Sequence, residues 1–267
     1  MEQILQLSTV YLSTSTGQDA LCTALDQTSK ALAVSINLRE QIGATDGSRL
    51  WSTLALLWKE LAQGSLDGAD GIDVPPCLSL ARFTRNLVAG VPSNQQLAYD
   101  LFEGHLVAIL FALSSYIALH DELLLPTTRM LVQTLSNIVT TNEALLSQFW
   151  STLVGMEESR NVLIRLLQAE DERTIHSTLV LLNNVLSGSS TRRHGLVTTP
   201  IGKRLLVLLL DATQRLFDAE QPADTSINAP TQYSLPSGGA FDVAYALFSD
   251  ILLAGDAPSV WEALRPQ

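Results

Sequence analysis

Apolar residues recur every three or four positions along most of this chain, a spacing that places them on one side of an α-helix. The clearest stripe runs through Cys77–Ala89, directly after Pro75-Pro76, a pair that suits the first turn of a helix. Regularly spaced strand patterns do not occur, and we therefore predict an all-α fold. Similar stripes predict further helices over residues 2–12, 18–42, 48–62, 94–119, 121–141, 143–153, 157–169, 174–186, 200–219 and 240–254, with a stub at 260–264.

Four of the predicted helices share a pattern around one polar residue. Each of Asn86, Asn137, Asn184 and Asp250 is followed by two apolar residues and then soon by a small or turn residue. The three asparagines lie 51 and 47 residues apart, at or above the upper edge of the period of about 40–47 residues that is typical of armadillo and HEAT repeats. The sequence thus predicts an α-solenoid of armadillo/HEAT-like repeats.

The predicted repeats form one domain over residues 1–267. One segment interrupts them, because residues 220–239 are polar, hold three prolines and end in Gly-Gly. Such a composition is typical of a long mobile loop. We expect this segment to join the last two predicted helices.

Stacked repeats would align the recurring polar residues along a concave surface. An asparagine amide both donates and accepts hydrogen bonds, so a row of asparagines suits the backbone of an extended partner chain. The candidate protein-binding groove consists of Arg82, Arg85, Asn86, Asn137 and Asn184. The alternative is that these asparagines cap helix ends or bond neighbouring turns within the protein.

Charge and hydropathy narrow the range of partners. The net charge is −11, and the densest basic cluster is only Arg192-Arg193-His194, so we expect no nucleic acid partner. The longest apolar run, 106–119, falls short of the ~20 residues that cross a bilayer and reads as a buried helix. With an acidic N-terminus and only Cys22 and Cys77, we expect a cytoplasmic protein without a signal peptide or membrane span.

Patterns of catalytic or metal-binding chemistry do not occur in the sequence. None of the four histidines lies four residues from another or at ligand spacing from a cysteine. A nucleophile elbow, a phosphate-binding loop and a dinucleotide fingerprint are also missing. The acidic pair after His120 is what the start of a helix favours. We therefore expect no enzyme activity, no catalytic residue, no metal and no cofactor.

The stretch Phe83–Gln95, FTRNLVAGVPSNQ, resembles the armadillo-type segment near the start of the ataxin-10 family. The matching positions are Arg85-Asn86 and Asn94-Gln95, and the segments 130–142 and 179–187 resemble further repeats of the same kind. The family's C-terminal repeat domain has no counterpart here, so the resemblance covers an N-terminal part only. It implies a cytoplasmic, non-enzymatic scaffold linked to cytokinesis and cell survival, with a fungal branch as the nearest relatives.

These observations favour a protein-interaction scaffold that binds other proteins on the concave surface. The main alternative is a self-assembling helical adaptor, a homo-oligomer that pairs through an exposed apolar face such as 106–119. An enzyme with an unfamiliar site is a further alternative, and a deep pocket with convergent polar groups would be its sign.

Overall fold

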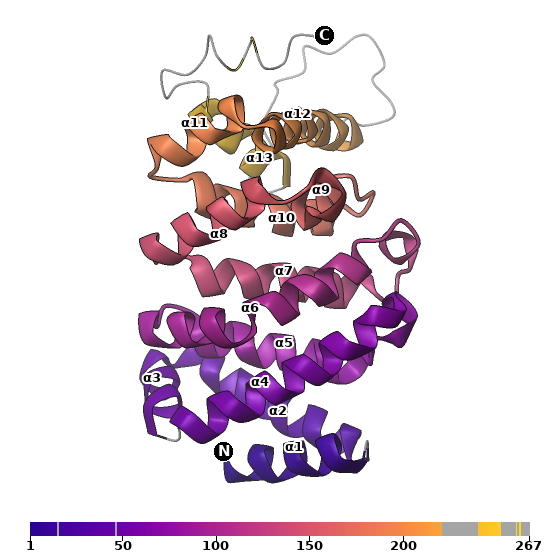
Figure 1. Cartoon of the computed structure of the whole chain (residues 1–267), viewed down its shortest axis with the longest axis vertical. Helices are drawn as coiled ribbons and strands as arrows, with labels where there is room; N and C mark the ends of the chain where they lie inside the picture. The colour runs from indigo at the N-terminus through magenta and orange to yellow at the C-terminus, as the bar shows by residue number, and fades with distance from the viewer. Residues whose placement is uncertain (15, 46, 221–239, 252–259, 261, 263–267) are drawn as a thin grey trace, which may run out of the picture. The chain divides into compact units, whose positions relative to one another are not determined.

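The computed structural model describes residues 1–267 except 15, 46, 221–239, 252–259, 261 and 263–267 (Figure 1). Thirteen α-helices and four short 3₁₀ helices occur in this part of the chain, and it contains no strand. The all-α prediction is confirmed. The chain divides into two compact units, residues 1–149 and 150–267.

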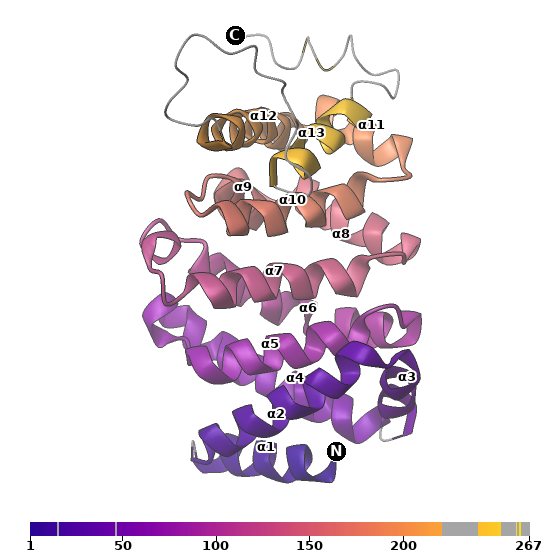
Figure 2. The ribbon, with the colours of Figure 1, turned by 180° about the vertical axis from the view of Figure 1, so that it is seen from behind.

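Unit 1 is built from two layers of helices. Helices α2, α5 and α7 lie side by side in the inner layer, which faces the viewer in Figure 2, and α4 and α6 pack against each other behind it. Helix α1 packs on α2 and α4, and α3 connects the two layers. The bounds are α1 Glu2–Thr14, α2 Gln18–Val34, α3 Ile36–Thr45, α4 Gly47–Gly64, η1 Ser65–Asp67, η2 Ala69–Gly71, α5 Val74–Val88, α6 Pro92–Leu113, η3 Ala118–His120 and α7 Leu125–Val139.

The predicted single helix over 18–42 is divided in two. Ser35 adopts an extended backbone conformation between α2 and α3. Its hydroxyl accepts a hydrogen bond from the Leu38 amide at 3.2 Å and so satisfies one of the amides at the start of α3. A serine that bonds its own backbone in this way competes with the continuous helix that the apolar pattern predicted.

The core of unit 1 lies between the two layers. Trp51 and Trp58 of α4 each approach the ring of Phe102 of α6, with ring centroids 6.2 and 6.1 Å apart. Helix α6 is long and apolar enough to cross a membrane by length and composition alone, but core helices meet the same criterion. Leu106, Ile109 and other α6 side chains are buried and the helix packs on α4 and α7, as expected for a core helix.

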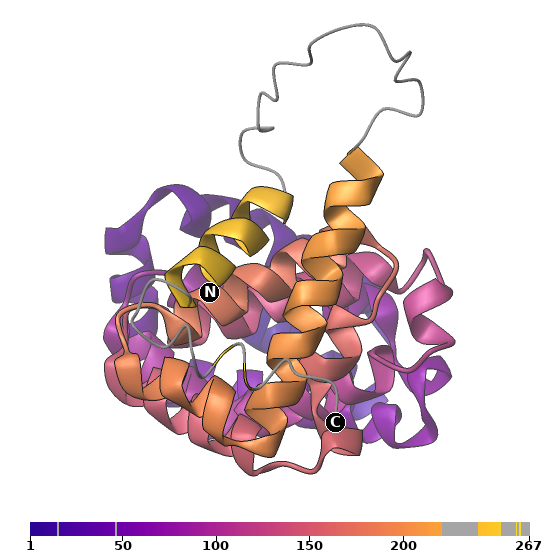
Figure 3. The same cartoon turned by 90° about the horizontal axis from the view of Figure 1, so that it is seen from above.

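Unit 2 begins inside α8 and has its own core. Helix α10 packs on α9 and α13, and α12 packs on α9, α11 and α13; α11, α12 and α13 are in the foreground of Figure 3. The predicted loop 220–239 lies outside the described residues, except for Glu220, which ends α12. The bounds are α8 Glu143–Gly155, η4 Glu158–Arg160, α9 Val162–Leu167, α10 Glu172–Leu186, α11 Ser190–Thr198, α12 Pro200–Glu220 and α13 Ala240–Ile251.

The repeat pattern identifies neighbouring helices within each unit. The helices of Asn86 and Asn137, α5 and α7, pack side by side in unit 1, and those of Asn184 and Asp250, α10 and α13, do so in unit 2. The stacking of all repeats into one solenoid domain stays a prediction.

Candidate protein-binding surface

The inner layer of unit 1 holds four of the five predicted site residues. On α5, the partly exposed positions Val74, Leu78, Arg82 and Arg85 follow one another at helical spacing and form a single stripe, while most of the helix is buried. This stripe lies between α2 and α7, because α5 is the middle helix of the layer (Figure 2). We call the stripe and the polar residues that it contacts on α2 and α7 the inner face.

The asparagine amides of the inner face bond to neighbouring helices. Asn86 is 8% exposed, and its Nδ2 donates to the carbonyl oxygen and the hydroxyl of Ser29 on α2, at 3.0 and 2.9 Å. Asn137 of α7 repeats the arrangement by donating from Nδ2 to the carbonyl oxygen of Arg85 on α5, at 3.1 Å. Each amide thus joins its helix to the preceding helix of the layer, as the alternative interpretation of the asparagines expects.

The two arginines of the stripe differ in their partners. Arg82 pairs with Asp26 of α2, with 2.7 Å between Nη1 and Oδ1. Arg85 donates instead to two neutral amide oxygens, from Nε to Asn86 at 3.2 Å and from Nη1 to Gln133 of α7 at 2.7 Å. Within the described part of the chain, no carboxylate pairs with Arg85, and its Nη2 has no hydrogen-bond partner.

The surroundings of Arg85 disfavour its charge. Burial lowers the pKa of its guanidinium, and the neighbouring charge of Arg82 lowers it further. Buried charges are normally paired with an opposite charge, since the loss of hydration is otherwise uncompensated. Arg85 is therefore a half-buried cation that Asn86 and Gln133 hold in position and that has no counter-ion among the described residues.

Asn184, the fifth predicted residue, belongs to unit 2. It lies in the last turn of α10 and is partly exposed. One layer of unit 1 therefore contains Arg82, Arg85, Asn86 and Asn137, whereas Asn184 belongs to unit 2.

Sequence reasoning missed the partners that position the arginines. Asp26, Ser29 and Gln133 come from the two helices on either side of α5, at 48 to 57 residues from the groups that they bind. Gln133 lies one helical turn before Asn137, as Arg82 lies one turn before Asn86. Aligning the repeats on their asparagines therefore matches Gln133 with Arg82, and this match could have identified Gln133 as a site residue.

The second pair of the family-like motif, Asn94-Gln95, closes the ends of other helices. Asn94 donates to the carbonyl oxygens of Leu87 and Arg39, both at 3.0 Å, and Gln95 donates to those of Asn137 and Thr140 at 2.9 and 2.8 Å. Both side chains are almost fully buried. The two side chains thus cap the C-terminal ends of α5 and α7, and Asn94 also joins α6 to the body of α3.

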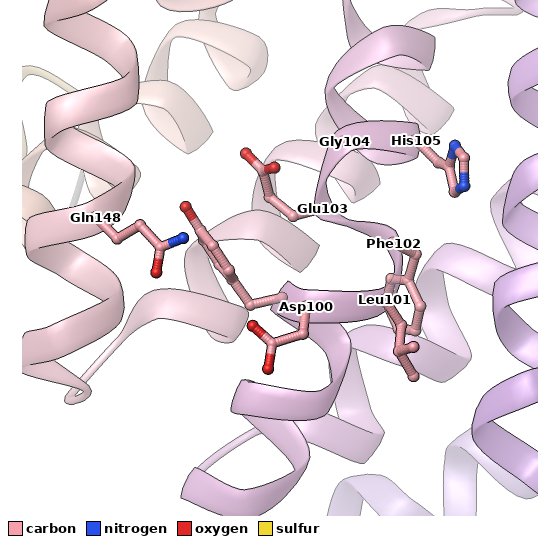
Figure 4. Close-up of a pocket in the computed structure, with 8 residues that line it drawn as sticks. Asp100, Leu101, Phe102, Glu103, Gly104, His105 and Gln148 are labelled. Atoms are coloured by element: carbon pink, nitrogen blue, oxygen red, sulfur yellow. The ribbon is translucent and has the colours of Figure 1, made fainter. Parts of the chain in front are cut away.

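A cavity of about 420 Å³ lies along α6 (Figure 4). Glu103 and Gln148 point into it, whereas His105 points away. Burial raises the pKa of Glu103. The lining residues, Tyr99–His105 and Gln148, include no serine or cysteine nucleophile. The described residues also hold no group of side chains suited to a metal ion. We therefore assign no reaction to this cavity.

An exposed apolar segment lies outside the predicted site. In the connection between α6 and α7, Tyr116, Ile117 and Leu123 are 79%, 82% and 80% exposed. The sequence interpretation placed the run 106–119 in the core or on a self-assembly face. In the structure, Leu106 to Leu113 contribute several fully buried side chains, although Phe111 among them is 36% exposed, and the strongly exposed apolar side chains follow beyond the helix.

Comparisons with known proteins give no relative of this chain. No family model, no curated protein and no solved structure matches it. The resemblance to the ataxin-10 family therefore stays a prediction.

Proposed function

We propose that this chain is a non-enzymatic protein-interaction scaffold that binds an acidic segment of a partner protein on the inner face of unit 1. The observation that carries the proposal is Arg85, a half-buried guanidinium without a carboxylate partner in the described part of the chain. The roles in cytokinesis and cell survival and the cytoplasmic location are proposed from the ataxin-10 resemblance alone.

The chemistry of arginine favours an acidic ligand. A guanidinium binds a carboxylate through parallel N–H donors, and its geometry is most specific when the side chain is already held in place. The bonds from Nε and Nη1 to Asn86 and Gln133 hold Arg85 and leave Nη2 for a ligand. A carboxylate from a partner would supply the counter-ion that the described part of the chain does not provide.

The rest of the inner face suits an extended protein segment. Leu78 and Arg82 continue the stripe along α5, so a ligand that reaches Arg85 also meets an apolar side chain and a second cation. The pair between Arg82 and Asp26 is about one-third exposed on both sides, which allows Arg82 to exchange partners at low cost. The asparagines contribute indirectly, because they hold α2, α5 and α7 in register.

The test compares the proteins that the full chain and its variants retain from cytosol. Arg85→Gln removes the cation and keeps an amide that can bond Gln133, while Arg49→Gln removes an exposed arginine that pairs with Glu2 at 3.3 Å. We expect mass spectrometry to identify a protein that wild type and Arg49→Gln retain and that Arg85→Gln loses. Equal recovery by all three proteins, with unchanged circular dichroism, would contradict the proposal.

A conservative variant separates charge from geometry. Arg85→Lys keeps the positive charge but loses the planar array of donors. The proposal expects an affinity for the retained protein between those of wild type and Arg85→Gln. A lysine variant as weak as the glutamine variant would show that geometry dominates.

A further inference from the structure

Three large apolar side chains are displayed on one short connection of unit 1, residues 114–124 between α6 and α7. Tyr116, Ile117 and Leu123 are each about four-fifths exposed, while Ala118 and Leu119 between them are buried. Single apolar residues on a surface are ordinary, whereas exposed apolar side chains that gather in one place can mark an interaction site. This segment is independent of Arg85 and is not part of the inner face.

The connection is held in a defined conformation. Backbone amides of Leu119, His120 and Asp121 donate to the carbonyl oxygens of Ser115, Ile117 and Ala118 at 3.0 to 3.2 Å. The Asp121 carboxylate then accepts from the Leu123 amide at 2.9 Å, and Asp121 O accepts from Leu124 and Leu125. The exposed side chains therefore project from an ordered turn, so that binding would order little additional backbone.

The ring of Tyr116 has a local support of its own. Its centroid lies 4.3 Å from that of the His120 ring, and His120 Nδ1 lies 2.6 Å from the Tyr116 carbonyl oxygen. Tyrosine is among the residues that contribute most to binding at interfaces. A supported yet exposed tyrosine is consistent with an anchor for a partner.

Charge decides which partner suits this segment. Glu122 is exposed and Asp121 partly so, and the whole chain carries a net charge of −11. A second copy of the chain would bring like charges together, which disfavours self-association through this segment. An anionic membrane surface would be repelled in the same way. A basic partner gains from both the apolar and the acidic side chains.

We propose that residues 114–124 bind an amphipathic helix of a partner protein whose apolar stripe is flanked by lysine or arginine. Tyr116, Ile117 and Leu123 contact the stripe, and Glu122 pairs with the flanking cations. This is an exposed-loop counterpart of the groove that receives an amphipathic helix in other proteins.

The test uses two labelled 18-residue peptides with the same leucine stripe, one flanked by lysines and one by glutamates. Fluorescence anisotropy measures their binding to the full chain and to Ile117→Ser/Leu123→Ser. We expect the lysine peptide to bind wild type and to lose at least about tenfold in affinity with the double variant, because two of the three apolar contacts are removed. The glutamate peptide is expected to bind neither protein measurably.

A control variant tests whether the lysine peptide is attracted non-specifically to an acidic protein. Val34, the last residue of α2, is 87% exposed, so Val34→Ser removes an exposed apolar side chain away from residues 114–124. It is expected to bind the lysine peptide as wild type does. Glu122→Lys is expected to weaken binding several-fold at low salt, and Tyr116→Ser provides a second apolar variant should the double variant not fold.

Several outcomes would overturn the proposal. One is equal affinity of wild type and Ile117→Ser/Leu123→Ser for the lysine peptide. Another is a wild-type dimer in sedimentation that the double variant abolishes, which would assign the segment to self-association. Wild-type flotation with neutral phosphatidylcholine vesicles, lost in the double variant, would assign it to a lipid surface.

Discussion

At the scale of single residues, the asparagines of the inner layer act within the fold. The amide of Asn86 is donated to Ser29 and that of Asn137 to the carbonyl oxygen of Arg85, so these groups connect three helices in sequence. Unlike these amides, the guanidinium of Arg85 keeps one nitrogen, Nη2, that could bind a ligand. Of the predicted groove residues, the proposed binding role therefore rests on Arg85 and not on Asn86 or Asn137.

This assignment predicts a loss of stability when Asn86 is changed to alanine. The change removes the bonds to Ser29 and deprives Arg85 Nε of its acceptor, and a buried group left unsatisfied costs about 1–3 kcal/mol. We expect urea unfolding to show a decrease of that order. Asn37→Ala, at an exposed position of α3, is the control and should change stability by less than about 0.5 kcal/mol. An Asn86→Ala variant as stable as wild type would contradict the internal role.

The residues that sequence could predict are those that share one helix. Helical spacing alone placed Arg82, Arg85 and Asn86 in one segment, and the structure shows both arginines in the partly exposed stripe of α5. The pairing of Arg85 with Gln133, or of Asn86 with Ser29, depends on which helices pack together. Such contacts across about 50 residues leave no local pattern to detect.

At the scale of helices, side chains from other helices bind the carbonyl oxygens at the ends of the inner-layer helices. Arg39 of α3 donates to the carbonyl oxygens of Leu32 and Ala33 at the end of α2 and to that of Ala89 after α5, at 2.6 to 2.9 Å. A cation at the negative end of a helix is favourable, and these carbonyls have no partner within their own helices. Gln95 closes the end of α7 in a similar way.

Removing this cap should loosen two helices together. Arg39→Met keeps much of the aliphatic stem and leaves three carbonyl oxygens without their donor. We expect a loss of roughly 2–3 kcal/mol, in line with hydrogen bonds to a charged donor. Hydrogen exchange should show faster exchange in the last turns of α2 and α5 and little change in α6. Exchange that increases uniformly, or in neither helix, would argue against a cap that links the two.

One helix start was predicted from its prolines, since Pro75-Pro76 fall in the first turn of α5, where a missing amide hydrogen carries no penalty. Pro92 and Pro126 also lie in the first turns of α6 and α7, but the predicted starts of these helices, residues 94 and 121, differ from the observed starts, Pro92 and Leu125. The break at Ser35 was missed, because the apolar stripe continues from Leu32 to Leu38 and only the serine side chain marks the change. Tertiary packing requires a glycine at position 43, because a Cβ there would lie 2.0 Å from Asn94 Oδ1 of α6.

At the scale of the whole molecule, the all-helical class followed from the apolar spacing, and the repeat pattern identified α5 with α7 and α10 with α13 as neighbours within their units. The division of the chain inside α8 could not be predicted, because the apolar stripe of that helix is continuous. The central claim is that a partner occupies the inner face of unit 1.

The most direct test of that claim is site-specific photo-cross-linking in cytosol. Benzoylphenylalanine replaces either Leu78, on the α5 stripe, or Leu56, which is 53% exposed on α4 in the other layer. We predict an adduct with a second protein from position 78 that disappears when Arg85→Gln is added, and no such adduct from position 56. An adduct from position 56 alone, or one from position 78 that Arg85→Gln leaves unchanged, would contradict the account.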